Sequence, residues 1–113
     1  MTLPSNINAL IERLNHELEN LELELSQSVE LIRFRINLFP ENLILIQLFA
    51  TLNNYIMFVE NTRRKIYEIE QYLGKEDLPD NELQEAGEDL SEQLGRVLEA
   101  KIIVNNIKKR LES

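Results

Sequence analysis

Phe39-Pro40-Glu41-Asn42 separates two long helical patterns, and its order of residue types returns at Leu3-Pro4-Ser5-Asn6 and Leu78-Pro79-Asp80-Asn81. Proline suits the first position of a helix, because the N–H that it lacks would have no partner there. It also disfavours helical backbone in the residue before it, so a preceding helix ends at this point. The Asn two residues later is placed to return a hydrogen bond to a free N–H at the helix start, as in a capping box. The three segments therefore predict three helix starts.

Apolar residues between these signals alternate at spacings of three and four, the pattern of a helix with one buried seam. We predict helices at about 5–37, 40–73 and 79–111, with Gly74 as the C-terminal cap of the second. The seam of the first helix consists of Ile7, Ile11, Leu14, Leu18, Leu21, Leu25, Ser28 and Ile32. The second seam consists of Leu48, Leu52, Tyr55, Val59, Thr62, Ile66, Ile69 and Leu73. The third consists of Leu83, Ala86, Leu90, Leu94, Val97, Ala100, Val104, Ile107 and Leu111.

The links between the predicted helices are very short, and short links make successive helices antiparallel neighbours. The predicted fold class is therefore all-α: one domain, 1–113, in which three long antiparallel helices form an up-down-up bundle with coiled-coil-like packing. A second arrangement keeps the first two helices as a hairpin and pairs the third helix with another subunit.

Composition excludes several classes of protein. The chain of 113 residues has no cysteine, which rules out disulfides, thiol catalysis and thiolate metal sites. The net charge of −8 argues against nonspecific nucleic-acid binding, which requires neutralisation of phosphates by Lys and Arg. The richest apolar stretch, 43–59, is interrupted by Gln47, Thr51, Asn53 and Asn54, so no uninterrupted apolar run reaches the ~20 residues of a membrane helix. We expect a soluble, cytoplasmic protein without a membrane partner.

The second predicted helix carries more apolar residues than one seam requires, and the end of the first helix shows the same excess. An up-down-up layout places both regions at one end of the bundle, where a monomer would expose a large apolar patch. Such patches usually mark interfaces. The predicted interface, with a second copy of the chain as partner, consists of Leu31, Phe34, Leu38, Ile46, Phe49, Ala50, Asn53 and Met57. The alternative is that the second helix is buried by both neighbours in a monomer.

Charges are distributed unevenly along the predicted bundle. Segment 75–92 holds eight acidic residues and one Lys, whereas the opposite end gathers Arg33, Arg35, Lys108, Lys109 and Arg110. In an antiparallel pair, the basic run 63–65 faces the first helix, and we expect it to pair with Glu12, Glu17 and Glu19. Such exposed pairs contribute little to the stability of a bundle but help to fix the orientation of its helices.

The sequence offers no set of residues with the spacing of a catalytic or cofactor site. His16 is the only histidine and is predicted to project away from the seam of the first helix, so neither a carboxylate-bridged metal site nor a catalytic triad can be assembled around it. No Gly-rich phosphate loop is present. We therefore predict no enzyme activity, no cofactor and no metal.

Two functions remain as hypotheses. The first is a non-enzymatic helical interaction protein, a homodimer or higher oligomer that serves as adaptor, scaffold or accessory subunit, with another protein as a further partner. The second is a small helical subunit of a nucleic-acid-handling complex. In that case the basic end would contact phosphates through Arg33, Arg35, Lys108, Lys109 and Arg110.

Overall fold

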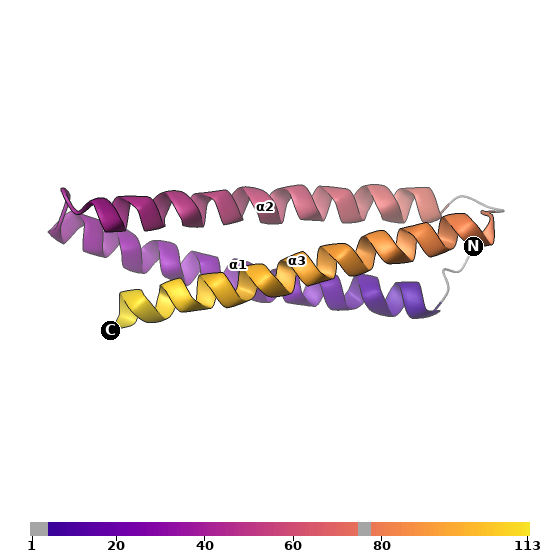
Figure 1. Cartoon of the computed structure of the whole chain (residues 1–113), viewed down its shortest axis with the longest axis horizontal. Coiled ribbons are helices and arrows are strands. Elements are labelled where there is room, and N and C mark those ends of the chain that lie inside the picture. Colours follow the sequence, from indigo (N-terminus) through magenta and orange to yellow (C-terminus); the bar gives the residue numbers. More distant parts are fainter. Residues whose placement is uncertain (1–4, 75–77) are drawn as a thin grey trace.

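Three long helices form an elongated bundle that measures 58 × 19 × 17 Å in the computed structural model (Figure 1). The structure describes residues 5–74 and 78–113. Helix α1 spans Ser5–Leu38, α2 spans Leu43–Leu73 and α3 spans Asp80–Glu112. The described residues contain no strand, which confirms the predicted all-α class.

The turn between α1 and α2 corrects the predicted start of the second helix. Residues 39–42 form a turn in which the N–H of Asn42 donates to the carbonyl of Phe39 at 3.1 Å. Pro40 therefore occupies the second position of a β-turn, where its fixed φ is equally suitable. Asn42 is itself the N-cap: its Oδ1 accepts hydrogen bonds from the N–H groups of Ile44 (3.0 Å) and Leu45 (3.2 Å). The helix begins at Leu43, three residues later than predicted, because Asn caps a helix from the position just outside it.

The other boundaries differ less from the prediction. Gly74 caps α2, and its N–H donates to the carbonyl of Glu70 at 3.0 Å, as expected. Pro79 is the N-cap of α3 and not its first helical residue; its carbonyl accepts from the N–H groups of Glu82 and Leu83 at 3.0 and 3.2 Å. The Leu3-Pro4 part of the first signal lies outside the described residues.

Contacts between the helices fix their directions. The pairs Glu17–Lys101, Glu24–Asn105 and Gln27–Lys108 rise together along α1 and α3, so these two helices are parallel. Arg63 of α2 pairs with Glu22 of α1, whereas Arg33 lies over the ring of Phe49, so α1 and α2 are antiparallel. The up-down-up arrangement is therefore confirmed, and α3 packs within its own chain.

These ion pairs differ from the predicted ones. Arg63 contacts Glu22 and not the predicted Glu12, Glu17 or Glu19. The position of Arg63 on α2 therefore lies opposite a later part of α1 than predicted. Glu17 instead pairs with Lys101 of α3 at 2.7 Å, and its side chain is only 14% exposed. The predicted partners Glu12 and Glu19 are exposed.

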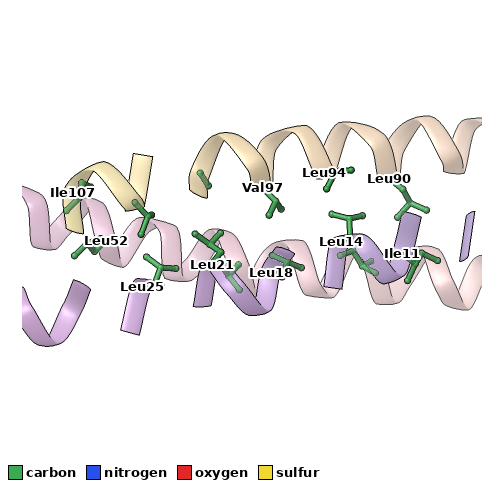
Figure 2. Packing of buried hydrophobic residues seen from close by; sticks show 14 of the residues in the cluster. Ile11, Leu14, Leu18, Leu21, Leu25, Leu52, Leu90, Leu94, Val97 and Ile107 are labelled. Atoms are coloured by element: carbon green, nitrogen blue, oxygen red, sulfur yellow. The ribbon is translucent and has the colours of Figure 1, made fainter. Parts of the chain in front are cut away.

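The core follows the predicted seams. All eight seam positions of α1 are buried, Leu83 is the only seam position of α3 that is not fully buried, and α2 buries Leu52, Val59, Thr62, Ile66 and Leu73. Figure 2 shows part of this core, in which Leu14 and Leu18 of α1 point toward Leu90 and Val97 of α3 and Leu52 of α2 lies near Ile107. The polar seam residues are satisfied locally: Ser28 Oγ donates to the carbonyl of Glu24 at 2.7 Å, and Thr62 Oγ1 donates to that of Phe58 at 2.8 Å. Gln93 is also buried, which the sequence pattern did not indicate.

The three helices are not packed equally. Helix α1 is the centre of the bundle, and α2 and α3 contact each other least. At the turn between α1 and α2, the hairpin extends beyond the C-terminus of α3 (Figure 1). No residue between Arg33 and Thr51 is buried. One end of the molecule is therefore an α1–α2 hairpin without a third helix to cover it.

Candidate functional site

Large apolar side chains are exposed at the uncovered hairpin end and along the outer face of α2 beyond it. Leu43 is 71% exposed and Met57 is 59% exposed, values typical of surface polar residues. The other large apolar residues exposed in this region are Phe34, Leu38, Phe39, Ile44 and Ile46. Between Arg35 and Glu60 the only charged residue is Glu41. Contiguous exposed apolar surfaces usually bind a partner.

The structure divides the predicted interface between two helices. On α2, Ile46, Ala50, Asn53 and Met57 are all exposed and share one face. On α1, Phe34 and Leu38 are exposed and lie one turn apart.

Two of the predicted interface residues belong partly to the core. Leu31 is half-buried and lies one turn from both Gln27 and Arg35, whose side chains reach α3. Its position is therefore on the α3 side of α1. Phe49 is half-buried against the core beneath the guanidinium of Arg33, whose carbon lies 5.9 Å from the ring centroid. That geometry allows a cation–π interaction and shields one side of Phe49 from a partner.

A shallow groove runs beside the exposed face of α2. It has a volume of about 450 Å³ and includes Val29 and Arg33 of α1 and Ile56 of α2. Its apolar floor and charged rim, formed by Glu22, Glu30, Glu60 and Arg33, are suited to the flank of another helix.

Sequence reasoning missed Phe39, Leu43 and Ile44 as surface residues. Leu43 and Ile44 at the start of α2 are not covered because α3 ends before it reaches them (Figure 1). The absence of charge between Arg35 and Glu60 was the available signal.

Helix α2 is long and apolar enough to cross a membrane, and it is the only helix in the described residues that meets this criterion of length and composition. In its most apolar window, only 11% of the residues are buried. The expectation of no membrane helix rested on Gln47, Thr51, Asn53 and Asn54, which interrupt the apolar run without adding charge. The criterion of length and composition averages hydropathy over a window and limits only the charged residues, so uncharged interruptions can pass it, whereas the sequence expectation required an uninterrupted apolar run.

The basic end is largely occupied by contacts within the chain. Arg35 donates to the carbonyl of Leu111 at 2.6 Å and to that of Ser113 at 3.2 Å. Lys108 donates to Gln27 Oε1 at 2.6 Å, and Arg33 covers Phe49. Of the five basic residues considered for phosphate binding, Lys109 and Arg110 are the two that are exposed without such a contact in the described structure.

Ionisable side chains gather in one pocket of about 350 Å³ between the end of α2 and the start of α3, which is lined by Lys65, Glu68, Tyr72, Glu82, Glu85 and Asp89. His16 is exposed, as predicted, with its Nε2 3.5 Å from Asn20 Nδ2. Within residues 5–74 and 78–113, no group of three or more His, Asp or Glu residues is placed to hold a metal ion. A hydrogen bond with Glu82 raises the pKa of Tyr72, where the end of α2 meets the start of α3.

Comparisons of this chain with family models, curated proteins and solved structures gave no match.

Proposed function

We propose that this protein is a non-enzymatic helical interaction module that associates with itself through the hairpin end, as an adaptor, scaffold or accessory subunit. The observation that supports the proposal is the exposed apolar face of α2 around Ile46, Ala50 and Met57, in a segment with a single charged residue. Removing an apolar face of this kind from water lowers the free energy, which favours binding of a partner.

The size of the effect can be worked from Met57. Burying a Met side chain fully contributes about 1.5–3 kcal/mol. Since Met57 is 59% exposed, a partner can bury about half of it, or about 1–2 kcal/mol in each copy. In a symmetric dimer the contribution counts twice, so replacing Met57 with Glu is expected to weaken association by about 30-fold or more.

The test is the mass of the particle by sedimentation velocity and light scattering, from low to high micromolar protein. We expect the wild type to form a dimer or larger oligomer and Ile46→Glu and Met57→Glu to shift it towards the monomer. Leu23→Glu is the matched control, because Leu23 is equally exposed at 59% but lies in the middle of α1. A wild type that stays monomeric at high micromolar concentration overturns the proposal. Phe49→Asp is a poorer test, since Phe49 also packs against the core.

The nucleic-acid hypothesis receives less support from the geometry. Arg35 and Lys108 make hydrogen bonds within the chain that a phosphate would have to replace. No specific observation favours it, and we do not propose it.

A further inference from the structure

Helix α2 carries a second heptad stripe on the side that faces away from the core. The outer stripe consists of Leu43, Ile46, Ala50, Asn53 and Met57, which alternate at spacings of three and four residues. All five are exposed, whereas the inner seam of the same helix buries Leu52 and Val59. A repeat of this kind keeps one face of a helix against another helix, and the bundle itself supplies no helix on this side.

We propose that two copies of the chain pair along the outer stripe, with the two α2 helices antiparallel about a two-fold axis that passes between Ala50 and Asn53. This inference rests on the proposed self-association and adds the partner surface and its geometry.

The charges beyond the stripe favour the antiparallel direction. The next two heptad positions after Met57 are Glu60 and Arg64, both exposed. In a parallel pair each of these would face its own copy, which places like charges opposite each other. In the antiparallel pair, Glu60 instead faces the uncharged start of α2 in the second copy.

The charges of the whole bundle favour the same direction. The described start of α3 carries six acidic residues and no basic one between 80 and 92. A parallel pair would place the two acidic segments at the same end of the dimer, where their like charges repel. The antiparallel pair points them in opposite directions.

The residues of the stripe fit the chosen axis. An axis between Ala50 and Asn53 sets Ile46 against Met57 of the second copy, so the two large exposed side chains bury each other. It sets Asn53 against Ala50 of the second copy, where the small methyl side chain leaves room for the amide. An Asn at such a position restricts register and oligomer state.

Cross-linking can test the geometry directly, because the chain contains no cysteine and an introduced one is the only thiol. We use single-cysteine variants and a bismaleimide that spans about 10 Å, comparable to the ~8–10 Å between packed helix axes. In the proposed dimer, position 50 is offset from its copy by three residues, or about 5 Å along the axis. Position 43 is offset by seventeen residues, or about 26 Å.

We expect Ala50→Cys to cross-link efficiently to a covalent dimer, and Leu43→Cys and the control Leu23→Cys to cross-link at least tenfold less. The mass of each variant is measured first, so that a failure of self-association is recognised separately. If Leu43→Cys cross-links as well as Ala50→Cys, the pair is parallel and the inference is wrong. If a dimer forms but Ala50→Cys does not cross-link, the outer stripe is not the interface.

Two further outcomes separate the inference from its alternatives. A monomeric wild type overturns the self-association proposal together with this inference. Flotation of the wild type with vesicles of phosphatidylcholine and phosphatidylglycerol, if it occurs and is abolished by Met57→Glu, assigns the stripe to a membrane surface and overturns the pairing. We expect no flotation.

Discussion

Arg35 holds the end of α3 against α1, and removing its side chain is expected to destabilise the bundle measurably. The last carbonyls of a helix have no partner within it. Arg35 supplies one: its guanidinium donates to the carbonyl of Leu111 at 2.6 Å and, in a more exposed position, to that of Ser113 at 3.2 Å. Its positive charge also lies at the negative end of the helix dipole.

The magnitude follows from these contacts. A hydrogen bond to a charged group contributes about 1.5–3 kcal/mol, and a cation at an exposed helix end contributes about 0.3–1 kcal/mol. Because Arg35 is only half-buried, water replaces part of both contributions, and we expect Arg35→Ala to lower the free energy of unfolding by about 1–2 kcal/mol. Arg35→Lys keeps the positive charge but lacks the planar guanidinium with its fixed donors. We therefore expect it to lower the free energy of unfolding about half as much as Arg35→Ala does.

The assay is urea denaturation followed by helical circular dichroism, at several protein concentrations so that self-association is separated from folding. With a slope of about 2 kcal/mol per molar urea, the middle of the usual range, Arg35→Ala should lower the midpoint by about 0.5–1 M. Arg110→Ala is the control. It also removes one positive charge near the C-terminal end of α3, but Arg110 is an exposed residue in the last turn of α3 itself. Equal midpoints for Arg35→Ala and Arg110→Ala would refute the assignment of Arg35 as the cap of α3.

Four other changes have expected outcomes. Asn42→Ala removes the cap of α2 and should cost about 1 kcal/mol in urea denaturation, whereas Asn42→Ser should cost much less. Lys101→Ala leaves the largely buried carboxylate of Glu17 without its partner and should cost about 1–3 kcal/mol; restoring stability with the added change Glu17→Gln would confirm that the unpaired charge is the cause. Gly95→Ala should raise the free energy of unfolding by about 1 kcal/mol, because a Cβ there meets nothing within 4 Å, and a loss of stability would contradict this. Asn53→Leu should tighten self-association and broaden the distribution of oligomers by sedimentation velocity, because the register is then less restricted.

The inner core was predictable because it depends on spacing alone. When apolar residues recur at spacings of three and four residues, the period of the helix places them on one face. Ile7, Leu18 and Ile32 could therefore be assigned to one seam without knowing which residues of the other helices they contact. Gly74 as a cap was predictable for a similar local reason. Gly87 and Gly95, in contrast, do not serve a close approach of helices, since open space surrounds both positions.

Features that depend on how one helix is placed along another were not predictable from spacing. Glu17 was expected to pair with the basic run 63–65 of α2, and only the placement of the helices along one another selects Lys101 of α3 instead. The start of α2 was ambiguous because proline fits both a β-turn and a first helical turn with the same φ. The exposure of Leu43 and Ile44 requires knowing that the hairpin extends beyond α3, which no local pattern encodes.

The polar residues on the outer side of α2 bear on what kind of surface can cover it. Gln47, Asn53 and Asn54 are all exposed there, within the most apolar part of the helix. In a lipid interior an amide without a hydrogen-bond partner costs about 2–7 kcal/mol, so a bilayer that covers the stripe must overcome this cost for each buried amide. A helix laid along the stripe covers a narrower band. It encloses Asn53, for which it can supply a partner, and leaves the flanking positions 47 and 54 at the edge in contact with water. The arrangement of amides, one in the stripe and two beside it, therefore favours a second helix over lipid as the partner of α2.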